Sequence, residues 1–468
     1  MKKRIFSTLL AAVLILATLS ACTTKPVKPT TESEAQEQSP PQNTDAAAST
    51  GSETLNVITV NDPAKLYLKD LIPVFESENK GIKVNLIEVP FDQFDSKIQT
   101  MLASKTPLDT TTHHGWTGFG ARLANGQLLD LTALIEKYSY DPAGEGITQS
   151  LCDIWNINGK VYAIPVCAFP SILLYNKDMF DAEGIPYPPA DYEDASWTWD
   201  KMVDIARKLT KNPDDPVKAQ YGILWNWDAG GHEQIPQYFG HMTFDEGTFS
   251  KNMGFAGESY FDKPEIIADY QKVLDLTFKW KVCPTTAMNE AVGGNAFFAG
   301  KAAMVVDGGW IMTSTSDVKF NVGIAAIPNG GGDVRDVLWI DPYWIFKDSK
   351  VPDAAFKFIM FLTKTDTQKL MIEKSNGLPP ANMNALDAYA SVFKKLDPKD
   401  VKAVYEGGFK YGFEGMSHLM PDAASLNTLL TNEMGSMFNE GKPASTVLPA
   451  IQKKVQQYIA DTRAKYGK

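Results

Sequence analysis

The sequence contains little cysteine and histidine, with four and five residues of these types among 468. No two cysteines form a CxxC pair, which argues against a structural zinc site. HExxH, GxSxG and phosphate-binding glycine-rich motifs are missing, so the sequence lacks several familiar signatures of enzymes. Basic residues form no block beyond the first four positions and the formal net charge is −11, so nucleic acid is not an expected partner. We predict no metal and no cofactor.

One long apolar run is present, and it lies near the N-terminus. Residues 2–4 are cationic, and residues 5–18 are almost wholly apolar. This run is shorter than the about 20 residues of a membrane-spanning helix and is typical of a secretory signal. The sequence Leu-Ser-Ala-Cys at 19–22 resembles the bacterial lipobox, which implies that residues 1–21 are a signal peptide and that Cys22 carries lipid. An ordinary secretory signal with an incidental cysteine is the alternative.

The segment 22–53 is rich in Thr, Ser, Pro, Gln and Glu, and Val27 is its only large apolar residue. Such a composition cannot bury enough surface to offset its chain entropy, so we expect a disordered tether. The chain beyond it is longer than one hydrophobic core usually organises, which predicts two lobes.

Strand and helix patterns alternate along the folded part. Period-two and helical spacings follow one another in four segments, 55–60, 65–79, 82–86 and 94–104. This order predicts an α/β fold with a mainly parallel sheet covered by helices. Thr198, Pro264 and Pro352 mark the expected starts of three later helices.

Three cysteines remain if Cys22 carries lipid. Cys152 and Cys167 flank a hairpin predicted at Asn158-Gly159. A disulfide between them is geometrically conceivable, and buried free thiols are the alternative.

Six segments, taken in order, resemble the family 1 extracellular solute-binding proteins of bacterial ABC importers, the group that contains the maltose-binding protein. They are NGKVYAIP at 158–165, LYNKDMF at 174–180, WTWD at 197–200, AFFAGKAAMVVDGGW at 296–310, VGIAAIP at 322–328 and NGLP at 376–379. The resemblance implies two α/β lobes joined by crossing strands, a ligand cleft between them and hinge closure. We place the first lobe at 54–165 and 329–375, and the second at 166–328 and 376–468.

The resemblance also implies a function. We expect a monomeric, lipid-anchored protein on the extracytoplasmic face of the cell membrane, which captures a sugar or oligosaccharide and delivers it to ABC permease subunits without catalysis. A secreted glycan-active enzyme with a carboxylate pair is one alternative. A protein that presents its ligand to a membrane sensor is another, and a polyamine is a second kind of ligand for such an acidic chain.

A sugar site needs aromatic planes for the C–H faces of the rings and directed polar groups for the hydroxyls. Trp310 is the first candidate, because it follows Asp307-Gly308-Gly309 at the end of a predicted strand, where ligands bind in open α/β sheets. Relatives carry a sugar-stacking aromatic residue at this motif. Asp307 is a candidate beside it, and a Trp packed in the core is the alternative.

The remaining candidates follow other predicted strands. They are Trp225 and Trp227 after 221–224, Asp341 and Tyr343 after the crossover at 322–328, His114 and Trp116 after 108–112, and Asp62 after 55–60. Adjacent histidines at 113–114 lack further ligands at metal-binding spacing, so we assign them no metal.

Overall fold

The computed structural model describes residues 52–61, 67–112, 118–215, 217–226, 232–245, 247–332, 334–414 and 419–468. Residues 50–468 form one compact unit. The predicted signal peptide, the lipid-attachment site and residues 22–51 of the predicted tether lie outside the described residues. The last tether residue, Glu53, instead begins the first strand, because its backbone pairs with the neighbouring strand. Four candidate ligand residues also lie outside the described residues: Asp62, His114, Trp116 and Trp227. Within the described ranges, no helix is both long and apolar enough to cross a bilayer.

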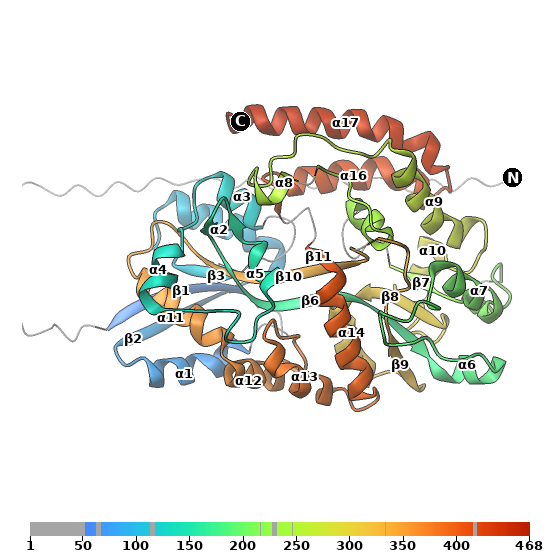
Figure 1. The fold of residues 1–468 in the computed structure, drawn as a ribbon, viewed down its shortest axis with the longest axis horizontal. Helices are drawn as coiled ribbons and strands as arrows, with labels where there is room; N and C mark the ends of the chain where they lie inside the picture. Colours follow the sequence, from blue (N-terminus) through green and yellow to red (C-terminus); the bar gives the residue numbers. More distant parts are fainter. Residues whose placement is uncertain are drawn as a thin grey trace, which may run out of the picture. The chain divides into compact units, whose positions relative to one another are not determined.

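The described residues of this unit form a mixed sheet of nine strands (Figure 1). Its strand order is β2-β1-β3-β10-β6-β8-β7, with β11 paired to β10 and β9 paired to β6. The strands are β1 (Glu53–Val60), β2 (Ile82–Val89), β3 (Thr110–Thr112), β6 (Ile164–Asn176), β7 (Leu224–Trp225), β8 (Met304–Gly308), β9 (Val322–Ala325), β10 (Asp336–Ile345) and β11 (Gly412–Glu414).

The expectation of a mainly parallel sheet is only partly met. β1 pairs in parallel with β2 and β3, and β7 pairs in parallel with β8. The long strands β6 and β10 are antiparallel to each other, and β10 is antiparallel to β3. Period-two patterns reveal strands but not their partners, so the sequence could not show that the joining strands reverse direction.

β6 belongs to both halves of the sheet. Its first part, Ile164–Pro170, pairs with β10, and its second part, Ser171–Asn176, pairs with β8 and β9. The partner therefore changes at Pro170–Ser171, and this crossing joins the two halves. The residue boundaries of the lobes stay a prediction.

Helices cover the half of the sheet built on β1, β2 and β3. Figure 1 shows α1, α11 and α12 on one face of this half and α2 and α3 on the other. They are α1 (Leu68–Glu78), α2 (Phe94–Ala103), α3 (Phe119–Ala124), α4 (Thr132–Tyr138), α5 (Gln149–Asp153), α11 (Pro352–Thr363) and α12 (Thr365–Ser375), with the 3-10 turn η2 (Phe91–Gln93) before α2. Phe75 of α1 packs on Phe358 and Phe361 of α11, with ring centroids 5.1 and 5.4 Å apart.

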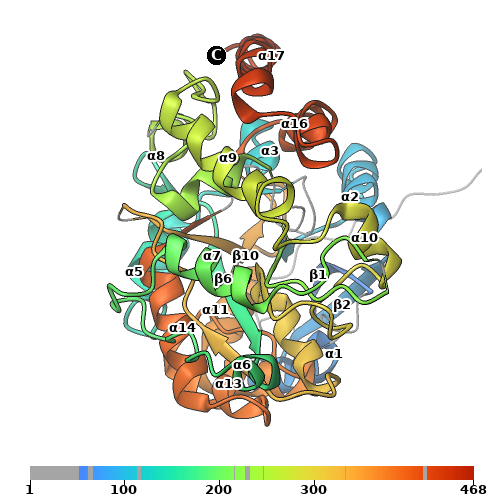
Figure 2. The same cartoon turned by 90° about the vertical axis from the view of Figure 1, so that its right-hand side faces the viewer.

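The other half carries the remaining helices. They are α6 (Lys177–Glu183), α7 (Trp199–Leu209), η4 (His232–Phe239), α8 (Gly247–Ser250), α9 (Pro264–Phe278), α10 (Thr286–Ala291), η5 (Gly309–Ser316), α13 (Leu386–Val392), α14 (Pro398–Tyr411), α16 (Ala423–Phe438) and α17 (Ala444–Lys465). The short 3-10 turn η6 (Met383–Ala385) packs on α12 of the first half and on α13. Figure 2 shows α16 and α17 side by side at one end, above α3 and α9.

The three helix starts predicted from sequence are confirmed. The Thr198 hydroxyl caps α7 by accepting a hydrogen bond from the Lys201 amide at 3.2 Å. Pro264 and Pro352 stand in the first turns of α9 and α11.

The predicted hairpin is present as well. β4 (Asn156–Ile157) and β5 (Lys160–Val161) pair around Asn158 and Gly159, which both have positive φ. Cys152 and Cys167 are free thiols, so the conceivable disulfide is not formed and the alternative holds.

Candidate ligand site

Three aromatic side chains meet where β6 and β10 join the halves of the sheet. Phe169 and Trp339 are cross-strand neighbours on β6 and β10. Trp310, at the start of η5, lies against both: its ring centroid is 4.7 Å from that of Trp339 and 6.3 Å from that of Phe169. Trp339 is only 9% exposed, whereas Trp310 is 36% exposed. The cluster therefore presents one open indole on an otherwise buried aromatic base.

The glycines before Trp310 allow this placement. A Cβ on Gly308 would lie 2.2 Å from the Trp310 indole, and a Cβ on Gly309 would lie 2.7 Å from the Tyr405 hydroxyl. Either contact would displace its neighbour, so the Asp-Gly-Gly-Trp sequence has a steric reason. The indole can fold back over the end of β8 because position 308 lacks a side chain, and the absence of one at position 309 leaves room for Tyr405.

Asp307, the residue before Gly308, hydrogen-bonds the residues around Trp310. Its buried carboxylate accepts hydrogen bonds from the Asn226 side chain at 2.8 Å, from the Gly308 amide at 2.7 Å and from the Trp310 side chain. Burial raises the pKa of Asp307 to about 6, although these donors oppose the rise. The carboxylate thus fixes the Trp310 indole and the Asn226 amide in place.

Asp341 and Tyr343 follow Trp339 along β10 but have different surroundings. Asp341 is half-buried and lies two residues from Trp339, so strand alternation puts the two on one face. The pairing of β10 with β6 shifts register between Asp341 and Pro342. Tyr343 is buried, interacts with the Tyr67 hydroxyl and packs near Phe358. Burial raises the pKa of Tyr343. A ligand contact by either residue stays a prediction.

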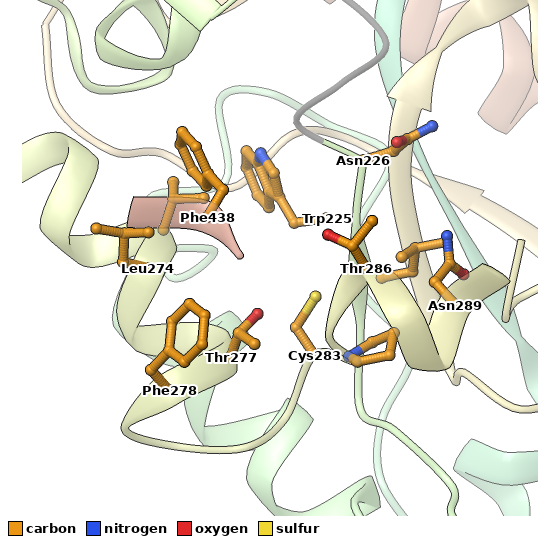
Figure 3. A pocket seen from close by; sticks show the side chains of 12 residues that line it. Trp225, Asn226, Leu274, Thr277, Phe278, Cys283, Thr286, Asn289 and Phe438 are labelled. Atoms are coloured by element: carbon orange, nitrogen blue, oxygen red, sulfur yellow. The ribbon is translucent and has the colours of Figure 1, made fainter. Parts of the chain in front are cut away.

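Trp225 is also buried rather than open. Its ring packs edge-on against Trp199 and Tyr238, with centroids 5.0 and 5.1 Å apart. Its other side lines a small cavity together with Cys283 and Phe438 (Figure 3). Burial raises the pKa of the Cys283 thiol, which keeps it protonated near neutral pH. A ligand contact by Trp225 stays a prediction.

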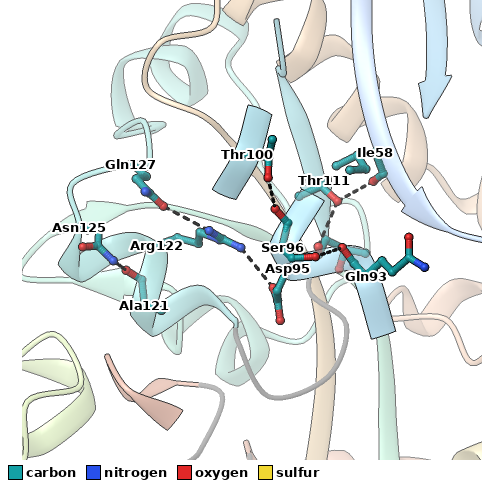
Figure 4. Close-up of polar contacts among 11 residues, drawn as sticks. Ile58, Gln93, Asp95, Ser96, Thr100, Thr111, Ala121, Arg122, Asn125 and Gln127 are labelled. Carbon is teal, nitrogen blue, oxygen red and sulfur yellow. Dashed lines mark hydrogen bonds and ion pairs between the residues drawn. The ribbon is translucent and has the colours of Figure 1, made fainter. Parts of the chain in front are cut away.

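β3 is the strand of the first half that lies next to β10 at the crossing. Thr112, the last residue of β3, pairs with Tyr343 of β10. The Thr111 hydroxyl donates to the Ile58 carbonyl at 2.6 Å, which ties β3 to β1 (Figure 4). On the helices beside it, the buried Arg122 guanidinium of α3 donates to Asp95 of α2 at 3.2 Å. These contacts fix the residues that flank 113–117.

Sequence reasoning did not predict that the two residues at the base of the cluster, Phe169 and Trp339, meet. Trp339 could have been selected because it stands two residues before Asp341 on one strand. Phe169 becomes its neighbour only through the register of β6 against β10, and no local pattern gives that register.

The family model described as bacterial extracellular solute-binding protein matches residues 59–369, more than half of the chain. The chain belongs to this family. Family membership and the two-lobed α/β fold, both predicted from the six segments, are confirmed. In this solute-binding protein the exposed Trp310 thus lies where the strands that join the lobes cross.

Named relatives extend the comparison. A maltotriose-binding protein of Pyrococcus abyssi is 24% identical over 353 residues, covering 74% of this chain and 68% of the relative. A maltooligosaccharide ABC transporter solute-binding lipoprotein of Streptococcus pneumoniae is 24% identical over 368 residues, covering 73% and 76%. An ABC substrate-binding protein of Listeria monocytogenes, solved with cycloalternan, has a TM-score of 0.70 at 22% identity and covers 87% of this chain and 99% of its own.

Proposed function

We propose that this solute-binding protein captures a neutral sugar or oligosaccharide outside the cell for an ABC importer. The open indole of Trp310, set between the lobes on Trp339 and Phe169, carries the proposal. An indole plane suits the C–H face of a sugar ring, and the half-buried Asp341 on the same strand face as Trp339 suits a hydroxyl. The sugar-binding names of the relatives from Pyrococcus and Streptococcus support the same ligand class.

The mechanism is binding coupled to lobe closure. β6 and β10 carry the connection between the lobes, so small changes along these strands would swing one lobe against the other. A sugar that contacts both lobes stabilises the closed state by its differential affinity for that state. The closed, monomeric protein then docks on the permease subunits and releases the sugar unchanged.

Lipid on Cys22 would keep the protein at the outer face of the membrane. The lipobox resemblance at 19–22 supports this, as does the Streptococcus relative that is named a lipoprotein. A diacylated cysteine anchors a protein without a spanning helix, because each buried CH2 contributes about 0.8 kcal/mol.

A thermal-shift screen of the unit 50–468 tests the ligand class. Maltose, maltotriose, mannitol and cycloalternan are the first probes. A bound sugar raises the melting temperature in a concentration-dependent manner, since it binds only the folded state. Chromatography of the recovered sugar should show no cleavage. No shift with any neutral sugar, or consumption of the sugar, would contradict the proposal.

A further inference from the structure

The 3-10 helix η4 lies beside the aromatic cluster. It packs against β10, α9 and α16. In a 3-10 helix, residues three apart share a face. The face of η4 that carries Tyr238 points to the crossing. The Tyr238 hydroxyl hydrogen-bonds the Ser171 hydroxyl at 2.7 Å, and the Tyr238 ring contacts Trp225. The next face holds Phe239, which packs on Trp199 with centroids 4.8 Å apart. Two of the three faces of η4 are therefore occupied by core contacts.

Gln234 and Gln237 make up the third face. They are 2% and 0% exposed. Within the described part of the chain, the amide nitrogen and the carbonyl oxygen of both side chains lack a hydrogen-bond partner. Buried polar groups are nearly always paired in folded proteins, because an unpaired one loses its hydrogen bonds to water without replacement. Four such atoms on one face of one short helix call for a partner from outside the fold.

Elsewhere the protein does satisfy a fully buried carboxamide. Gln368 of α12 is as buried as Gln237, yet its amide donates to the carbonyls of Val166 at 3.0 Å and Leu362 at 2.7 Å. The side-chain carbonyl of Gln368 accepts a hydrogen bond from the backbone amide of Asn382 at 3.5 Å. The contrast shows that burial alone does not explain the unpaired atoms on η4.

We infer that the carboxamides of Gln234 and Gln237 hydrogen-bond the hydroxyls of the bound sugar and so determine which sugars fit. This inference rests on the proposed function. A carboxamide offers both donors and an acceptor, and a hydroxyl is both donor and acceptor, so the two match. η4 packs on β10, the strand that carries Trp339 and Asp341, so the helix that carries both carboxamides lies beside the aromatic cluster. The carboxamides are covered in this structure, so the inference includes a parting of the lobes that uncovers them.

Gln234→Leu and Gln237→Leu, made in the unit 50–468, separate this role from a structural one. Leucine keeps most of the side-chain volume and removes the unpaired dipoles. Without sugar, each variant should therefore melt at the wild-type temperature or about 1–2 °C higher. The affinity for the tightest binder among maltose, maltotriose, mannitol and cycloalternan should fall roughly tenfold, measured by calorimetry.

Gln368→Leu is the matched control, because its carboxamide is equally buried but paired. It should melt at a lower temperature and keep the wild-type affinity. If the η4 variants also melt at a lower temperature and keep the wild-type affinity, the carboxamides are structural and the inference is overturned. In that case, sugar binding by the wild-type protein would still support the proposed function. A wild-type protein that binds none of the sugars would overturn both.

Discussion

Trp310 is the residue on which the proposed sugar capture depends most directly. Trp310→Ala should weaken binding of the best sugar by about 1–3 kcal/mol, the range of losses when an aromatic plane that stacks on a nucleobase is removed. The fold should survive, because the side chain is more than one-third exposed and removing it opens no enclosed cavity. Calorimetry gives the affinity, and circular dichroism checks the fold.

Trp280→Ala provides the control for Trp310→Ala. Trp280 is 37% exposed, nearly the same as Trp310, but it stands beyond the end of α9 under the Arg207 guanidinium, 4.8 Å from its ring centroid. Its loss should leave the affinity unchanged. Equal losses in the two variants would mean that the Trp310 indole has no special place in the site.

At the scale of elements, the hinge strands hold a buried carboxyl group. Asp336 begins β10 and accepts hydrogen bonds from the Tyr192 hydroxyl at 2.6 Å, the Val337 amide at 2.7 Å and Ser171 of β6. Burial raises the pKa of Asp336 to about 8 against these donors. The group therefore ties β10 to β6 at the crossing, and it does so in its protonated form near neutral pH.

Because the pKa of Asp336 is raised in the folded state, the stability of the fold depends on pH. Between pH about 4 and 8 the folded state holds a proton on Asp336 that the unfolded state has released. The contribution of Asp336 to the free energy of unfolding thus falls as pH rises through that window, by up to about 1.4 kcal/mol per pH unit. Above pH 8 this contribution levels off. Asp307 adds the same trend up to pH about 6.

Denaturant unfolding at pH 5, 6.5 and 8 measures this dependence. Asp336→Asn removes the titrating group while keeping its shape, so the decline between pH 6.5 and 8 should flatten in the variant. An identical decline in wild type and variant would show that Asp336 ionises normally in the folded protein.

The elements also show what the sequence could predict. The Asp-Gly-Gly-Trp motif led to Trp310 because a strand, two glycines and an aromatic residue form one local pattern. The meeting of Phe169 with Trp339 could not be predicted, because it depends on the register between β6 and β10. Tyr343 was selected with Asp341 by simple alternation, and the register shift between Asp341 and Pro342 explains its different surroundings. The buried carboxamides of η4 gave no sequence signal, since an unpaired group is visible only in three dimensions.

At the scale of the whole molecule, the proposed lipid on Cys22 would set where capture occurs. Cys22→Ala should abolish incorporation of labelled palmitate, because the Cys22 thiol is the proposed acceptor of the diacylglycerol. Cys283→Ala is the matched control, since that thiol is buried in the folded unit, and it should retain the label. Continued labelling of Cys22→Ala would contradict the lipobox assignment.

Calorimetric titration of the unit 50–468 with maltotriose and the other neutral sugars tests the central claim most directly. The account predicts saturable heat with a single sugar per chain and full recovery of the uncleaved sugar after the titration. Absence of saturable binding across the neutral sugars, at concentrations that saturate a control sugar-binding protein, would contradict it.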